Sequence, residues 1–198
     1  MIYNYQDIQN IDSLINFESV LFFDMDGTLV DTNLANFLAY KKAVLSVTKT
    51  DHNLYYNPEK RFNRSNLKNV IPNLSENQEG RIIQEKEIFY DDFLRETKLN
   101  NLILEVLIKY SITNQTVLVT NCRKDRALAI LNYHGLIDKF NNIFFRQFSE
   151  DEEKINKYQN AISCFGISAN RIIVFEDEIL EINDAKMAGI PISNIIKI

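Results

Sequence analysis

Apolar runs of strand length, each followed by polar side chains, restrict the fold of this chain more than any other feature. The clearest runs are Val20–Phe23, Thr116–Val119 and Arg171–Phe175. After residue 114, strands of this kind alternate with helical stripes that end at glycine. Strands that alternate with helices form a parallel sheet covered by helices on both faces. We therefore predict an α/β fold with a Rossmann-like, three-layer core.

The segment between the first two strands has a different character. From residue 33 to about residue 110 the sequence shows helical periodicity and little strand signal. A chain of 198 residues is long enough for one domain with a smaller one inserted into it. We predict a discontinuous core made of residues 1–32 and 111–198, and an all-helical cap domain made of residues 33–110.

Composition excludes several classes of function. A net charge of −5 and a pI of about 5.2 argue against a nucleic-acid-binding face. The first residues lack the basic start and apolar core of a signal peptide, and no apolar run approaches membrane-spanning length. Cys122 and Cys164 lie far apart without metal-ligand spacing. We expect a cytoplasmic protein that binds neither nucleic acid nor membrane.

Two carboxylates, Asp24 and Asp26, come directly after the first strand and are followed by Gly27 and Thr28. At ~6 Å and an effective dielectric near 20, the repulsion between two such charges is about 3 kcal/mol. A bound cation or a proton on one carboxyl group would relieve it. The alternative is an ordinary acidic turn, since Asp-Gly is common turn chemistry.

Polar residues also follow the later strands. Thr120 and Asn121 come where a helix begins, so nearby backbone N–H groups would favour a phosphate oxygen, although a simple helix cap is the alternative. Glu176 and Asp177 follow the strand that ends at Phe175, and carboxylate oxygens are ligands that Mg²⁺ prefers. Because the carboxyl ends of parallel strands lie along one edge, we expect all these groups to meet there.

The sequence resembles the haloacid dehalogenase superfamily, specifically its helical-cap phosphatases and β-phosphoglucomutase-like proteins. The resemblance rests on Asp24–Asp31 as the first motif, Thr120-Asn121 as the second, Lys154 as the third and Glu176-Asp177 as the fourth. Their order and approximate spacing agree over nearly the whole chain, and the insert begins just after the first motif.

The resemblance implies a role for each of these residues. Asp24 would attack phosphorus and form an aspartyl-phosphate, while Asp26 would protonate the leaving oxygen and then deprotonate water. Mg²⁺ would be held by the side chains of Asp24 and Asp177 and by the backbone carbonyl of Asp26. Glu176 would be either a direct ligand or a residue that contacts a ligand. The phosphoryl oxygens would be neutralised by Thr120, the backbone of Asn121 and Lys154.

Departures from the family pattern concern the lysine and the last acidic segment. Lys157 competes with Lys154 for the phosphate-binding role, and we favour Lys154 because its distance to Gly166 better suits the family's helix. Glu178 stands where a serine or another small polar residue is usual. Glu181 stands where aspartate or glycine is common.

These features predict a Mg²⁺-dependent phosphatase that hydrolyses a small phosphate monoester, with a small phosphorylated metabolite as its partner and a monomer or homodimer as its assembly. A sugar-phosphate mutase of the β-phosphoglucomutase type would use the same core residues. A binding or regulatory protein that keeps the fold without turnover is a third alternative, because a fold alone does not determine function.

Overall fold

The computed structural model describes residues 3–4, 11–148 and 154–198. The chain divides into two compact units: the first comprises Met1–Val30 with Leu99–Ile198, and the second comprises Asp31–Lys98. The fold is therefore a discontinuous α/β core into which one segment is inserted. Within the described ranges, no helix combines the length and the apolar character needed to cross a membrane.

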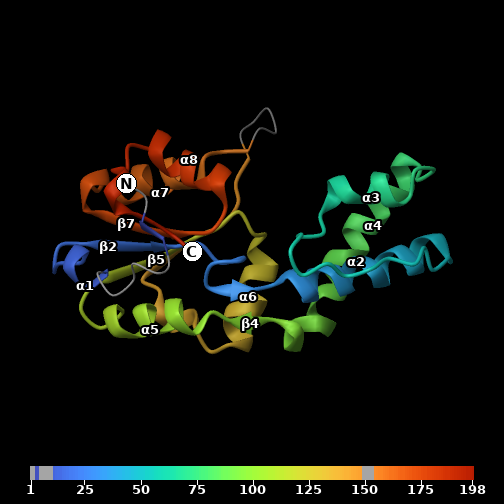
Figure 1. Cartoon of the computed structure of the whole chain (residues 1–198), viewed down its shortest axis with the longest axis horizontal. Helices are drawn as coiled ribbons and strands as arrows, with labels where there is room; N and C mark the ends of the chain where they lie inside the picture. Colours follow the sequence, from blue (N-terminus) through green and yellow to red (C-terminus); the bar gives the residue numbers. More distant parts are fainter. Residues whose placement is uncertain (1–2, 5–10, 149–153) are drawn as a thin grey trace. The chain divides into compact units, whose positions relative to one another are not determined.

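A parallel sheet of six strands forms the centre of the first unit (Figure 1). Its strands, in spatial order, are β1 (Tyr3–Asn4), β8 (Ile195–Lys197), β7 (Ile172–Glu176), β2 (Val20–Phe23), β5 (Gln115–Val119) and β6 (Asn142–Phe144). Phe23 of β2 is in register with Phe175 on one side and with Leu118 on the other. The three apolar runs of the sequence thus form neighbouring strands at the middle of the sheet, which confirms the predicted parallel α/β architecture.

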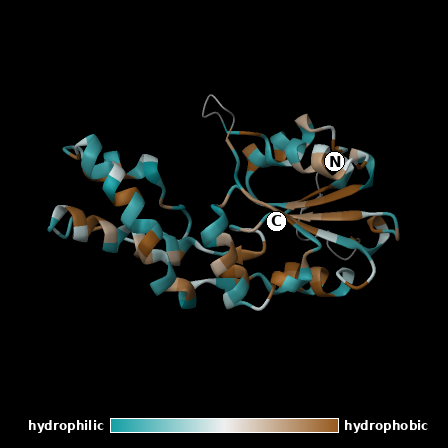
Figure 2. Ribbon diagram, turned by 180° about the vertical axis from the view of Figure 1, so that it is seen from behind, coloured by the Kyte–Doolittle hydropathy of each residue, from teal (hydrophilic) through white to brown (hydrophobic). Residues whose placement is uncertain are grey.

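Helices cover both faces of this sheet (Figure 1). One face carries α7 (Lys157–Phe165) and α8 (Ile179–Met187), and the other carries α5 (Asn101–Tyr110) and α6 (Lys124–Tyr133). Because side chains alternate along a strand, Phe22 joins the core beneath α7 and α8, whereas Phe23 points to the opposite face. Figure 2 shows the strands as predominantly hydrophobic, as expected for a sheet that is buried on both sides.

Shorter elements complete the first unit. They are α1 (Ile11–Leu14) and the 3₁₀ segments η3 (Ile137–Lys139), η4 (Ala169–Arg171) and η5 (Ile192–Asn194). β3 (Val30–Asp31) and β4 (Lys98–Leu99), whose bounds include the two junctions between the units, form a separate two-stranded sheet. The helical spacing of Ile8, Ile11, Leu14 and Ile15 predicts an N-terminal helix, of which α1 is the described part, and residues 8–10 lie outside the described part of the chain.

The inserted unit is built from helices around its own apolar core. Its elements are α2 (Asn33–Thr48), α3 (Arg64–Val70), α4 (Glu76–Phe89) and the 3₁₀ segment η2 (Tyr90–Glu96). Its core includes Phe37, Tyr40, Val44, Leu67 and Ile82, all of them buried. A helical unit that contains its own core is the arrangement expected of an inserted cap domain.

The far boundary of the insert differs from the predicted one. We expected the insert to end at residue 110, but the two units divide between Lys98 and Leu99. The reason is α5, whose buried residues Ile103 and Leu107 place it in the first unit. Helical periodicity alone did not distinguish this helix from those of the insert, because both kinds have an apolar stripe.

Candidate active site

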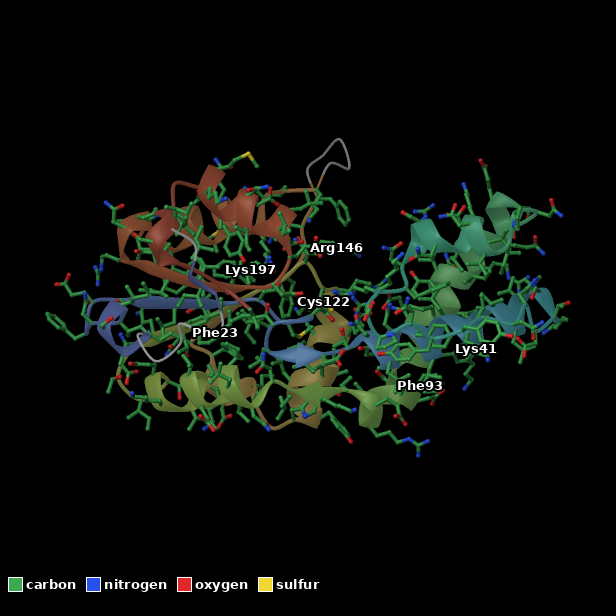
Figure 3. All side chains as sticks on the ribbon, viewed as in Figure 1. Phe23, Lys41, Phe93, Cys122, Arg146 and Lys197 are labelled. Carbon is green, nitrogen blue, oxygen red and sulfur yellow. The ribbon has the colours of Figure 1, made fainter. Side chains whose placement is uncertain are left out.

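The carboxyl edge of the sheet brings together residues that are far apart in the sequence. The N–H of Asp24 donates to the carbonyl of Phe175 at 3.1 Å, and the N–H of Thr120 donates to the carbonyl of Phe144 at 2.9 Å. These bonds extend the parallel ladder by one residue and place Asp24, Thr120 and Glu176 at adjacent strand ends. Cys122 and Arg146, which Figure 3 labels, belong to the loops that follow β5 and β6.

A buried lysine lies at the centre of this edge. The Lys157 ammonium donates to Asp24 Oδ1 at 2.5 Å and to Glu176 Oε2 at 2.8 Å, and it forms an ion pair with Glu181. Its side chain is only 1% exposed. Buried charges are tolerated when they are paired and hydrogen-bonded, so Lys157 and its carboxylates are mutually dependent.

The electrostatics of this cluster leave an excess of negative charge. Burial, followed by the neighbouring charge of Glu176, raises the pKa of Asp24 well above its usual range, and Lys157 only partly offsets this. Burial likewise raises the pKa of Glu176. Burial opposes the charged form of Lys157. The neighbouring groups have the larger combined effect, and they raise the pKa of the lysine: Asp24 contributes most, followed by Tyr158 and then by Glu176 and Glu181. A further cation would therefore stabilise the site.

Glu176 is held by hydrogen bonds at both carboxylate oxygens. Oε2 accepts from Lys157 and, at 2.6 Å, from the hydroxyl of Tyr158. Oε1 accepts from the backbone N–H groups of Asp177 and Glu178, each at 3.1 Å. The carboxylate of Glu176 thus accepts four hydrogen bonds. Through them it orients the Lys157 side chain and the turn that carries Asp177.

The turn after β2 positions Asp177. Gly27 has a φ of +95°, and a β-carbon there would lie 2.3 Å from Oδ2 of Asp177. The buried hydroxyl of Thr28 donates to Oδ1 of Asp177 at 2.8 Å. The Asp-Gly-Thr sequence therefore does more than form a turn: the missing side chain of Gly27 makes room for a carboxylate that arrives from β7.

Arg126 is a charged neighbour of Asp26 that the sequence did not indicate. One guanidinium nitrogen lies 4.0 Å from Asp26 Oδ2, while Nε donates to Cys122 Sγ at 3.0 Å. Arg126 is in the first turn of α6, where an arginine is usually a solvent-exposed charge. No motif or spacing marks it, because its proximity to Asp26 arises only where α6 and the turn after β2 meet in the folded chain.

Thr120 and Asn121 occupy the loop between β5 and α6. Thr120 is buried, and its hydroxyl oxygen accepts from the N–H of Cys122 at 3.1 Å. The side-chain amide of Asn121 donates to Glu181 Oε1 at 2.6 Å. Both residues therefore lie at the edge where we expected them, although α6 itself begins only at Lys124.

The two lysines that compete for the third motif differ in their surroundings. Lys157 contacts Asp24, whereas Lys154 is 45% exposed and contacts Glu181 at 3.1 Å. The helical spacing of Ile155, Tyr158, Ile162 and Phe165 predicts a helix from residue 155, but α7 begins at Lys157. Asn156 determines this start, since its side-chain oxygen accepts from the N–H groups of Tyr158 and Gln159. Lys157, and not Lys154, is therefore the lysine that contacts Asp24 in the described part of the chain.

Comparison with known proteins identifies the family. A family model for haloacid dehalogenase-like hydrolases matches residues 21–195. The chain belongs to the haloacid dehalogenase-like hydrolase family. It is therefore an enzyme of this family, and the predicted family resemblance is confirmed. No curated protein matches the chain.

Solved structures share the haloacid dehalogenase fold over most of the chain. A candidate β-phosphoglucomutase from Thermotoga maritima is 25% identical, with a TM-score of 0.64 and coverage of 89% of this chain and 83% of that one. CbbY from Rhodobacter sphaeroides, solved in complex with phosphate, is 19% identical, with a TM-score of 0.67 and coverage of 87% and 83%. YfnB from Bacillus subtilis, solved bound to magnesium, is 18% identical, with a TM-score of 0.60 and coverage of 87% and 86%.

The donor groups of this haloacid dehalogenase-like site fit a hard divalent cation. Carboxylate oxygens of Asp24, Glu176 and Glu181 lie within 4.8 Å of one another, but the ammonium of Lys157 contacts all three. The carboxylate of Asp177 lies against Gly27 and accepts from the hydroxyl of Thr28. Oxygen donors with excess negative charge are the surroundings that Mg²⁺ prefers.

Proposed function

We propose that this protein is a Mg²⁺-dependent phosphatase that hydrolyses a small phosphate monoester through an aspartyl-phosphate. The observation that carries the proposal is the buried contact between Asp24 and Lys157 at a sheet edge that also holds Asp26 and Asp177. A carboxylate nucleophile, an acid–base carboxyl group and a cation are the groups that phosphoryl transfer requires.

In the proposed reaction the two aspartates act in turn. A carboxylate oxygen of Asp24 attacks phosphorus, and the bond from phosphorus to the ester oxygen breaks as Asp26 gives that oxygen a proton. Asp26 then accepts a proton from water, whose oxygen attacks phosphorus and releases inorganic phosphate from Asp24. Arg126, 4.0 Å from Asp26, would help to hold that side chain in place through both steps.

The phosphoryl oxygens would be bound by groups from one loop and one helix. We assign this role to Thr120, to the backbone N–H of Asn121 and to Lys157, which replaces Lys154 in our assignment because it contacts Asp24. These donors are fixed before the substrate arrives, and preorganised donors contribute most to stabilising developing charge.

Asp24, the backbone carbonyl of Asp26 and Asp177 would hold Mg²⁺, and Glu176 would act through Lys157 and the Asp177 turn. When bound, the ion would neutralise charge on the transferring phosphoryl group. Binding of the ion would also lower the raised pKa of Asp24 and so favour the ionised nucleophile. The phosphate complex of CbbY and the magnesium complex of YfnB support this assignment by their shared fold.

Release of inorganic phosphate from a broad panel of monoesters, measured with excess Mg²⁺ and again with EDTA, tests the proposal. We expect turnover of at least one small phosphorylated metabolite, and a loss of at least about a hundredfold in EDTA. Absence of turnover for the whole panel, or equal rates under both conditions, would contradict it.

Gly27→Ala tests the proposed role of Asp177. The new methyl group would press on the Asp177 carboxylate, so we expect the Mg²⁺ concentration for half-maximal activity to rise at least about tenfold. Gly189→Ala is a matched control, because Gly189 also has a positive φ of +88° but its β-carbon would meet only the Ala169 methyl at 3.8 Å. Both variants place an alanine at a positive φ. An equal Mg²⁺ requirement in the two variants would show that Asp177 does not hold the metal.

A sugar-phosphate mutase is the second candidate, favoured by the 25% identity to the Thermotoga maritima protein. It would use the same aspartates but transfer the phosphoryl group back to a sugar hydroxyl in place of water. Isomer interconversion without net phosphate release would identify this activity and would replace the phosphatase proposal.

A further inference from the structure

Glu181 engages Lys157, which the proposed function assigns to an incoming phosphate, together with the side chains of Asn121 and Lys154. Its Oε1 accepts from the side-chain amide of Asn121 at 2.6 Å and from the ammonium of Lys154 at 3.1 Å. Its Oε2 forms an ion pair with Lys157. The carboxylate is thus bound by one amide and two ammonium groups, a donor set that would bind a phosphoryl group equally well.

The surroundings of Glu181 keep it in this position as an anion. Its side chain is only 15% exposed. Burial opposes ionisation of this carboxyl group, but Lys157, followed by Lys154 and the amide of Asn121, outweighs that effect and lowers its pKa. Near neutral pH the lysines therefore face a fixed negative charge.

The position of Glu181 in α8 explains how this side chain reaches the lysines. The residue lies in the first turn of α8, directly after the segment that carries Glu176 and Asp177. A glycine at this position would have no side chain to reach Lys157, and an aspartate would be shorter by one methylene. The contacts with Lys154 and Lys157 therefore depend on the choice of glutamate.

We propose that Glu181 is an internal competitor of the substrate, a carboxylate that occupies Asn121, Lys154 and Lys157 until a phosphoryl group displaces it. This inference rests on the proposed function, because Lys157 is one of the groups assigned there to the phosphoryl oxygens. It implies that weakly bound phosphate esters are excluded and that inorganic phosphate, the product, is released readily. Glu181 would thus limit affinity for anions while leaving the lysines in place for turnover.

Glu181→Gln tests this proposal directly. Glutamine keeps the size of the side chain and an oxygen that can accept from Asn121, but it removes the charge. We expect the dissociation constant of inorganic phosphate, measured by titration calorimetry with excess magnesium chloride, to fall at least about tenfold. We expect phosphate to become a correspondingly stronger product inhibitor of any turnover that the wild type shows.

Glu178→Gln provides a matched control. Glu178 stands at the N-cap of α8 and is exposed, so the substitution removes one charge from the same helix end without touching the Asn121–lysine group. Its phosphate affinity should stay within about twofold of the wild-type value, because exposed charges are screened by solvent and salt. An equal gain in phosphate affinity in Glu181→Gln and Glu178→Gln would overturn the proposal, since the gain would then reflect the change in net charge alone.

Glu181→Asp keeps the charge and shortens the side chain, and it serves as a second variant if Glu181→Gln fails to fold by circular dichroism. We expect its phosphate affinity to lie between those of the wild type and the glutamine variant. An affinity at or below the wild-type value in both variants would show that Glu181 positions the lysines for phosphate and does not compete with it. The absence of phosphate binding in every form would overturn the proposal in the same way.

The two proposals can fail separately. Tighter phosphate binding by Glu181→Gln in a protein that hydrolyses no monoester would support the internal competitor and contradict the phosphatase. Turnover by the wild type together with unchanged phosphate affinity in Glu181→Gln would leave the phosphatase and exclude the competitor.

Discussion

Asp24→Asn is expected to abolish phosphate release, with kcat reduced by roughly four orders of magnitude or more. Asparagine matches the shape of the aspartate but lacks the anionic oxygen that would attack phosphorus. The rate of phosphate release from the best substrate of the monoester panel measures this effect. Trapping with beryllium fluoride provides an independent signal, because a stable acyl-phosphate analogue should form on the wild type and be absent in the variant.

The stability of Asp24→Asn distinguishes a chemical defect from a folding defect. Asp24 belongs to a buried cluster in which carboxylates outnumber the lysine they contact, and burial raises its pKa. Removing one of these charges should leave the thermal midpoint equal to or above that of the wild type. Turnover that survives in a folded Asp24→Asn protein would exclude Asp24 as the nucleophile.

Lys157→Met should lower kcat/KM by at least about a thousandfold, whereas Lys154→Met should change it by less than about threefold. The two substitutions remove the same charge, but only Lys157 is buried against Asp24 and Glu176. Lys154 is 45% exposed, and its ion pair with Glu181 lies at the rim of the site. Steady-state kinetics on both variants therefore decides which lysine acts in catalysis.

The same pair of variants should differ in stability and in its dependence on pH. Removing Lys157 leaves buried carboxylates without their cation, which we expect to lower the free energy of unfolding by about 3 kcal/mol at pH 8. The pKa values of Asp24 and Glu176, already raised by burial, would rise further without the lysine. Because the folded variant would then take up more protons than the unfolded chain, its stability deficit should shrink as the pH falls toward 5.

Urea unfolding of both variants at pH 8 and pH 5 measures this deficit. Lys154→Met should match the wild type at both pH values, since exposed ion pairs contribute little. A larger loss of activity in Lys154→Met than in Lys157→Met would restore the preference that the sequence alone suggested.

Much of the site could be predicted because its residues follow strands that are easy to recognise. Asp24, Thr120 and Asp177 each come after an apolar run, and parallel strands must bring their carboxyl ends to one edge. The alternation of strands and helices likewise predicts the sheet without knowledge of any contact. These predictions depend only on local pattern and on the geometry of a parallel sheet.

Other features depend on packing that no local pattern describes. The choice between Lys154 and Lys157 depends on where α7 begins, which Asn156 determines by capping the helix two residues later than expected. The boundary at Lys98 depends on the side on which α5 buries its apolar stripe. The approach of Arg126 to Asp26 depends on how one helix packs near the carboxyl edge of the sheet.

The parallel α/β core and the carboxylates after its first strand follow from the order of apolar and polar residues along the chain, because that order sets which segments form strands and helices. The pairing of charged side chains with one another follows from the three-dimensional packing. Lys157 contacts Asp24, Glu176 and Glu181, three residues separated from it by up to 133 positions in the sequence. Such pairings follow from the burial of side chains in three dimensions, where a charge must find a partner once it loses water.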